Sequence, residues 1–131
     1  MTIHSILSLT SDGKTLAKSL WEENMHESWS AYNGSDMFVV FEQGDIVGGF
    51  AIYRDESDGL KGIFCSGWAE RHRKVPVADI IKQIAYNVGD VYFKTDQRTA
   101  KILLEKIGEK VKKTERFVYY IVRGNKNGKT E

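Results

Sequence analysis

The chain has 131 residues, of which 41% are hydrophobic and 28% are charged, and its formal net charge is +1. This length predicts one domain, and the hydrophobic fraction is sufficient for one core. A net charge this close to zero argues against a general nucleic-acid binder, because such proteins carry a large excess of Lys and Arg.

Cysteine use and hydropathy bear on where the protein is located. Cys65 is the only cysteine, so an internal disulfide is impossible and a reducing compartment fits. The N-terminus lacks a basic segment followed by an apolar run, and no apolar run approaches the roughly 20 residues that span a bilayer. We therefore expect a soluble, cytoplasmic protein that consists of one domain at 1–123 and a flexible polar tail at 124–131.

The N-terminal half predicts a short strand, a helix and a hairpin. After a strand-like opening, the stretch 14–29 has helical periodicity and predicts one amphipathic helix, or two helices broken near Asn24. Its apolar positions are Leu16, Leu20, Met25 and Trp29, with Ala17 and Trp21 beside them. A loop at 30–36 leads to a strand at 37–42, and the turn 43–45 joins it to a partner strand at 46–54. Gly48 and Gly49 in that partner indicate a bulge or a close backbone approach.

The stretch 60–88 reads as a strand, a basic turn and a helix. An acidic turn at 55–59 precedes the strand, which starts at Leu60 and is expected to break at 66–68. The turn 69–74 carries three fixed positive charges and a histidine. The helix is expected to begin near Pro76, whose fixed φ suits a first helical turn. Cations and helix N–H groups that point at one place could hold an anion, although a solvated loop is the alternative interpretation.

The C-terminal half alternates helices and strands. The helix at 76–88 should end at Gly89, and its expected apolar face is Val77, Ile80, Ile81, Ile84, Ala85 and Val88. A strand at 90–94, a helix at 98–107 closed by Gly108, and a terminal strand at 116–122 or a hairpin follow. This order predicts an α/β protein with a mixed sheet: an antiparallel meander, a β-α-β crossover and a C-terminal strand.

This order of elements resembles the GNAT superfamily of acyl-coenzyme A N-acyltransferases over nearly the whole chain. The most specific similarity is at 95–108, where family members often have an asparagine, an alanine, a tyrosine and a closing Glu-Lys-x-Gly-Phe. The matching residues are Ala100 and the run Glu105-Lys106-Ile107-Gly108, with Thr95 or Asp96 near the asparagine position. Leu104 stands at the tyrosine position, and Glu109 stands at the phenylalanine position.

The resemblance implies that acetyl-coenzyme A is the acyl donor and binds between the fourth and fifth strands. It implies that the pantetheine contacts backbone groups of Ile63, Phe64 and Cys65, and that the phosphates face Arg71, Arg73 and Lys74. The family's glycine-rich loop corresponds here to 70–77, which contains no glycine and includes Pro76. Proline removes one N–H group, and side chains cannot reproduce a close backbone approach.

The resemblance also implies direct acetyl transfer to the amine of a small molecule or a protein, bound over the acidic turn, without a metal. Leu104 cannot protonate the departing thiolate, so the candidate acids are Tyr92, Tyr119 and Tyr120. The base is either Glu42 or a water held by a backbone carbonyl. Cys65 is interpreted as a core thiol, and a nucleophilic role assisted by His72 is the less favoured alternative.

Two other functions remain open. The glycine-free loop and Leu104 also resemble GNAT-like proteins of short-tailed bacteriophages, including an internal virion component. That resemblance implies a catalytically inactive virion or host-interaction factor, located in the virion or the host cytoplasm. A weaker alternative is nucleic-acid binding through the basic turn and the cluster Lys110, Lys112 and Lys113, against which the net charge counts.

Overall fold

The computed structural model describes residues 1–29, 36–70 and 73–124. The expected loop at 30–35, Arg71 and His72 of the basic turn, and residues 125–131 of the expected tail lie outside the described residues. The elements in chain order are β1 (Thr2–Ser5), the 3-10 turn η1 (Ile6–Ser8), α1 (Ser11–Met25), β2 (Asp36–Glu42), β3 (Asp45–Ser57), β4 (Leu60–Ala69), α2 (Val77–Val88), β5 (Val91–Thr95), α3 (Arg98–Ile107), β6 (Glu109–Lys113) and β7 (Val118–Val122).

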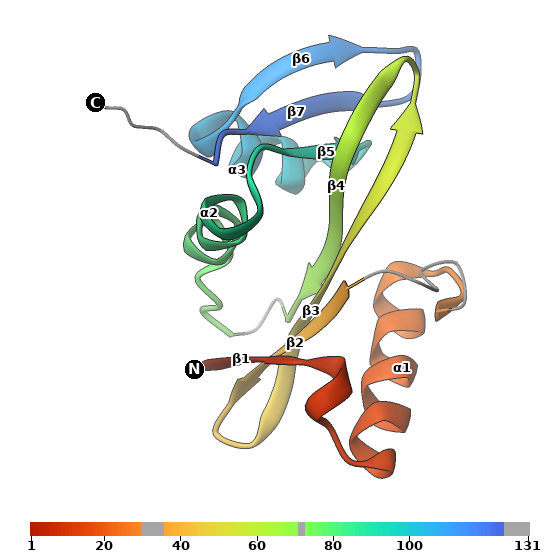
Figure 1. The fold of residues 1–131 in the computed structure, drawn as a ribbon, viewed down its shortest axis with the longest axis vertical. Coiled ribbons are helices and arrows are strands. Elements are labelled where there is room, and N and C mark those ends of the chain that lie inside the picture. The colour runs from red at the N-terminus through yellow and green to blue at the C-terminus, as the bar shows by residue number, and fades with distance from the viewer. Residues whose placement is uncertain (30–35, 71–72, 125–131) are drawn as a thin grey trace. The chain divides into compact units, whose positions relative to one another are not determined.

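The described strands form one mixed sheet in the order β1-β2-β3-β4-β5-β7-β6 (Figure 1). β2 is antiparallel to both β1 and β3, whereas β4 and β5 run parallel and are joined through α2. β7 lies between β5 and β6 and is antiparallel to both. The expected mixed α/β architecture is therefore confirmed, and the chain ends in the hairpin alternative rather than in a lone strand.

The contacts divide the chain into two compact units. The first comprises Met1–Tyr53 with Ser66–Val75, and the second comprises Arg54–Cys65 with Pro76–Glu131. The strands β3 and β4 contribute residues to both units because each is long.

The core of the first unit is built around Trp21 of α1. Its side chain is 1% exposed, and it clusters with Met37, Ala51 and Trp68 from three strands. The exposed fraction of Leu16 is 52%, so the face of α1 that packs inward is set by Ala17 and Trp21. Of the expected apolar positions, Leu20, Met25 and Trp29 pack against this core, and only Leu16 was assigned to it incorrectly.

Helix α1 begins and ends through local hydrogen bonds. The Thr10 hydroxyl accepts from the Gly13 N–H at 3.1 Å and caps the N-terminus. The helix ends at Met25, earlier than the expected residue 29, because His26 adopts a left-handed conformation with φ of 58°. The Trp29 N–H instead donates to the Glu22 carboxylate at 2.7 Å, and the Trp29 ring meets Trp21 edge to face.

The glycine pair in β3 lies directly beside a bulge at Val47 and is closely approached by another strand. The β2–β3 register shifts between Val40 and Phe41. A Cβ atom at Gly49 would lie 2.8 Å from Trp68 Nε1, and one at Gly48 would lie 3.1 Å from the Trp68 carbonyl oxygen. These positions therefore need glycine because Trp68 of β4 packs directly on them.

Two expectations about β3 and β4 were wrong. The turn between these strands consists of Asp58 and Gly59, both with positive φ, while residues 55–57 continue β3. β4 does not break at 66–68 but continues to Ala69. Gly67 is a packing glycine, because a Cβ atom there would lie 2.6 Å from the Phe50 ring.

The second unit contains helices α2 and α3 and strands β5, β6 and β7. The bounds of α3 agree with the expectation, and Leu104 is its buried side chain. Pro76 precedes the first residue of α2, where it acts as the N-cap with φ of −78°. All five residues of β7 are buried, whereas all five residues of β6 are exposed. Among the described residues, no helix is both long and apolar enough to cross a membrane.

Candidate cofactor and acceptor site

The parallel strands β4 and β5 meet where the cofactor is expected. Phe64 of β4 is paired with Tyr92 of β5, and their ring centroids are 5.2 Å apart. A Cβ atom at Gly62 would lie 3.1 Å from the Tyr92 ring, so this ring lies directly on the β4 backbone. The side chains of Phe64 and Cys65 are buried, and Ile63 is half-buried. What these residues can offer a ligand is therefore their backbone.

Burial determines the chemistry of Cys65. The thiol is 3% exposed, and desolvation raises its pKa from 9.0 to about 12. At neutral pH this side chain therefore stays a protonated thiol, whereas the nucleophilic form of cysteine is the thiolate. The geometry favours a core thiol over a catalytic one.

Cys65 should resist thiol reagents in the native protein at pH 8 and react at least about 100-fold faster in urea, because access requires unfolding. The raised pKa has a second consequence. The unfolded chain loses the thiol proton above pH 9, whereas the folded chain keeps it until about pH 12. The stability of the native chain relative to Cys65→Ala should therefore fall over that range, by at most about 1.4 kcal/mol per pH unit.

A matched control for Cys65 is Lys61→Cys in a Cys65→Ser background. Lys61 is exposed on the same strand, so its replacement should react at the rate of a free thiol in the folded protein. Rapid labelling of native Cys65 under the same conditions would contradict the buried position.

Arg73, a predicted phosphate ligand, makes two ion pairs within the first unit. Its Nη2 atom lies 2.8 Å from Asp45 Oδ2, and its Nη1 atom lies 3.3 Å from Glu42 Oε1. Hydrogen bonds to Asp45 and then to Glu42 raise the pKa of Arg73 above its ordinary value. The guanidinium thus fastens the turn after β4 to the β2–β3 hairpin, and Glu42, the candidate base, is held by the same contact.

The other predicted phosphate ligands differ in their surroundings. Lys74 is exposed and makes no ion pair with the described residues. Arg71 lies outside the described part of the chain. Helix α2 begins after Pro76 without a side-chain cap, and Asp79 lies in its first turn.

Tyr119, a candidate acid, fixes the tip of the β3–β4 hairpin. Its side chain is fully buried, and its hydroxyl is bonded to the Ser57 hydroxyl at 2.7 Å and donates to the Asp58 carboxylate. The half-buried Ser57 and the exposed Asp58 therefore supply the hydrogen-bond partners that the buried Tyr119 phenol needs. The phenol is already engaged as a structural hydrogen-bond donor.

Tyr120, the other candidate acid on β7, is bonded to α3. Its side chain is 1% exposed, and its hydroxyl donates to Glu105 Oε2 at 3.1 Å. Burial, followed by the bond to Glu105, raises the pKa of this phenol. Leu104, which precedes Glu105 in the sequence and stands at the position of the family's tyrosine, is 3% exposed. Tyr120 therefore connects the last helix to the sheet.

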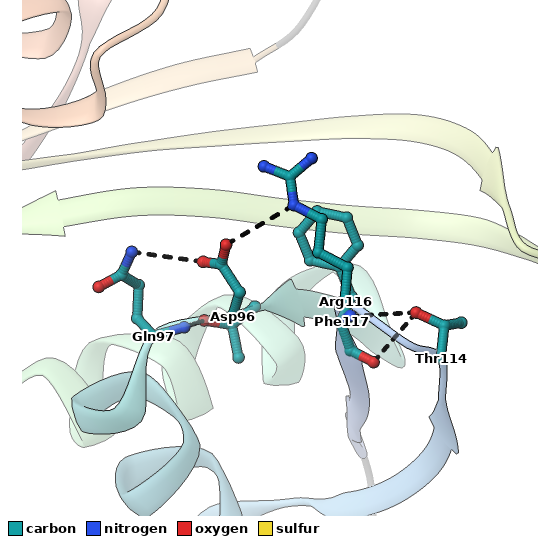
Figure 2. A network of polar contacts seen from close by, with 6 residues as sticks. Asp96, Gln97, Thr114, Arg116 and Phe117 are labelled. Carbon is teal, nitrogen blue, oxygen red and sulfur yellow. Dashed lines mark hydrogen bonds and ion pairs between the residues drawn. The ribbon is translucent and has the colours of Figure 1, made fainter.

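A group of cations that the sequence did not reveal lies at the end of β5. Lys94 Nζ is 4.3 Å from the centroid of the Phe117 ring, and the Arg116 guanidinium carbon is 4.8 Å from it. The Arg116 Nε atom also faces Asp96 at 3.9 Å, as Figure 2 shows. Lys94 and Arg116 are far apart in the sequence, and only the β5–β7 register brings them to one ring.

No set of three or more His, Cys, Asp or Glu side chains in the described ranges is placed to hold a metal ion. No protein-family model matches the sequence, and no curated protein matches it.

Several solved structures are similar over almost the full length of the chain. The N-acetyltransferase PseH from Campylobacter jejuni has a TM-score of 0.64 at 13% identity, over 93% of this chain and 96% of that one, and it has also been solved in complex with acetyl coenzyme A. The ribosomal-protein-alanine N-acetyltransferase from Brucella melitensis has a TM-score of 0.58 at 11% identity, over 94% and 99%.

An acyl-CoA N-acyltransferase from Pseudomonas aeruginosa has a TM-score of 0.64 at 10% identity, over 92% of this chain and 97% of that one. The agreement covers the meander, the crossover and the final hairpin together, although few residues are identical. The chain therefore has the fold of the GNAT superfamily of acyl-coenzyme A N-acyltransferases.

Proposed function

We propose that this chain is an N-acetyltransferase that moves an acetyl group from acetyl-coenzyme A to the amine of a small molecule or a protein. The observation that supports the proposal most strongly is the parallel pair β4–β5 within a GNAT-type sheet. A protein of the same fold has been solved with acetyl coenzyme A bound. The single cysteine agrees with the reducing cytoplasm as its location.

The proposed cofactor contacts come from backbone and exposed cations. The pantetheine would exchange hydrogen bonds with the β4 backbone at Ile63, Phe64 and Cys65. The side chains of Phe64 and Cys65 are buried, and that of Ile63 is half-buried and apolar. The resemblance assigns Arg71 and Lys74 to the phosphates. Arg73 is assigned a supporting part in the proposal, because both of its terminal nitrogens already contact carboxylates.

The proposed chemistry depends mainly on positioning. The neutral amine attacks the thioester carbonyl carbon, a carbon–nitrogen bond forms and the carbon–sulfur bond breaks. The proton of the amine passes to water, and the departing coenzyme A thiolate takes a proton from solvent. We assign these transfers to water rather than to Tyr119, Tyr120 or Glu42, because those three side chains have partners within the protein. Tyr92, which packs on Phe64 at the β4–β5 pair, stays a candidate acid for the thiolate.

Isothermal titration calorimetry of the full chain with coenzyme A and acetyl-coenzyme A tests this function. We expect saturable binding with both ligands and a rise in the melting temperature, since a ligand that binds only the folded state stabilises it. Lys74→Met should weaken binding about tenfold through the loss of one charge-assisted contact. Lys82→Met, on the exposed side of α2, is the matched control. Neither heat nor a thermal shift at millimolar ligand would overturn the proposal.

A second candidate is a non-catalytic protein on the same fold, such as a virion component or host-interaction factor of a phage. It is favoured by the glycine-free segment 70–77 and by the buried Leu104 at the position of the family's tyrosine. Fold alone does not fix function, so loss of the site is compatible with the architecture. Measured acetyl transfer to any amine would exclude this candidate.

A further inference from the structure

Hydrogen bonds within the second unit hold Phe117 and Lys94, two members of the group formed by Lys94, Phe117 and Arg116. Thr114 closes the β6–β7 turn: its Oγ1 accepts from the Phe117 N–H at 3.0 Å, and its own N–H donates to the Phe117 carbonyl at 2.8 Å. Lys94 Nζ donates to the Ser57 hydroxyl at 3.1 Å while it lies over the ring. Both cations therefore have fixed neighbours before any ligand arrives.

The charges of this group are incompletely neutralised. Lys94 makes no ion pair with any carboxylate among residues 1–29, 36–70 and 73–124. Arg116 is 76% exposed along its side chain, and its one acidic contact is the long one from Nε to Asp96. Asp96 also accepts from the Gln97 amide, and Figure 2 shows the two terminal nitrogens of Arg116 directed away from Asp96. Those nitrogens and the Lys94 ammonium remain as donors for an anion.

The position of this group relates it to the proposed transfer site. Lys94 is two residues beyond Tyr92, which pairs with Phe64 of β4. Side chains two residues apart on a strand share one face of the sheet and are about 7 Å apart. Lys94 thus stands on the same face of β5 as the ring that packs on β4, two residues farther along the strand, and Arg116 contacts the same Phe117 ring as Lys94.

We propose that Lys94 and Arg116 form an anion-binding pair and that the amine acceptor carries a carboxylate or a phosphate group. This inference rests on the proposed function, because it describes the acceptor of that same reaction. The anion would be bound by the Lys94 ammonium and the terminal Arg116 nitrogens, both of which lie against the Phe117 ring. This arrangement orients the rest of the acceptor along β5, and a neutral amine of the same shape lacks that anchor.

Acetyl transfer should be measured with two pairs of acceptors. Leucine is compared with leucinamide, and glucosamine 6-phosphate is compared with glucosamine, so the two pairs separate a carboxylate from a phosphate. We expect the anionic member of at least one pair to have a kcat/KM about tenfold or more above its neutral counterpart, as expected for a charge-assisted contact. Lys94→Met and Arg116→Met should each remove that preference by raising KM.

Lys110→Met is the matched control, because it removes one exposed lysine from the neighbouring strand β6. Lys110 is paired with Tyr120, whereas Lys94 is paired with Tyr119, so their side chains lie on opposite faces of the sheet. The control should keep the preference of the native chain. Transfer that does not distinguish the anionic from the neutral acceptors would overturn the inference and leave the proposed function standing.

Nuclear magnetic resonance supplies a readout that does not need turnover. Glucosamine 6-phosphate and leucine, titrated into the isotopically labelled full chain, should shift the signals of Lys94, Arg116 and Phe117 in a saturable way. Their neutral counterparts should not. If transfer is absent with every amine, the proposed function fails, and these shifts alone decide whether the anion-binding pair exists. Equal shifts from charged and neutral probes would overturn it.

Discussion

Truncation of Trp21 to alanine is expected to lower the free energy of unfolding by about 3–5 kcal/mol. The indole is 1% exposed and contacts the buried side chains of β2, β3 and β4, so its removal leaves a cavity that these strands cannot close. Because a domain is stable by only about 5–15 kcal/mol, a loss of this size should leave a measurable unfolded fraction in mild denaturant. Urea unfolding followed by near-ultraviolet circular dichroism measures the change.

The matched control is Leu16→Ala on the same helix. Leu16 is 52% exposed, and the substitution should change the stability by no more than about 0.5 kcal/mol. Similar losses for the two variants would contradict the orientation of α1. The pair therefore tests which residues of α1 face the core, where hydrophobic periodicity misplaced only Leu16.

The substitution Tyr119→Phe removes one oxygen atom and is expected to lower the free energy of unfolding by about 1–3 kcal/mol. The change leaves Ser57 and Asp58 without the phenol that both of them contact at the hairpin tip. Tyr86→Phe makes the same chemical change at a side chain that is 74% exposed, and it should be neutral. Chemical denaturation of both variants gives the comparison, and equal stabilities would refute a structural role for the Tyr119 hydroxyl.

The sequence predicted those elements whose boundaries are marked by strong local signals. Helix α3 has a regular apolar face and is followed by Gly108, and its bounds were predicted correctly. Of the two alternatives for the stretch 14–29, the structure agrees with a break near Asn24, because α1 ends at Met25 and His26 adopts a left-handed conformation. The continuation of β4 through Gly67 was missed because glycine was interpreted as a strand breaker, whereas here it accommodates Phe50.

Side-chain partners far apart in the sequence were the part of the site that could not be predicted. Periodicity gives the face of an element, but not which residue stands opposite on another strand. The contact of Arg73 with Asp45 and the meeting of Lys94 and Arg116 at Phe117 both depend on pairing. The cofactor residues on β4 could be proposed from the sequence only because the resemblance to a known family indicated which strand binds the cofactor.

The outer strand β6 has a consequence for the behaviour of the protein in concentrated solution. One side of β6 pairs with β7, and β6 is the last of the described strands in the sheet, so no described strand pairs with the main-chain groups on its other side. Lys110, Lys112 and Lys113 are exposed along it. Two copies approaching edge to edge would bring like charges together, which disfavours fibrous association. The strand at the opposite edge, β1, is only four residues long, so it offers few main-chain groups with which a strand of another copy could pair.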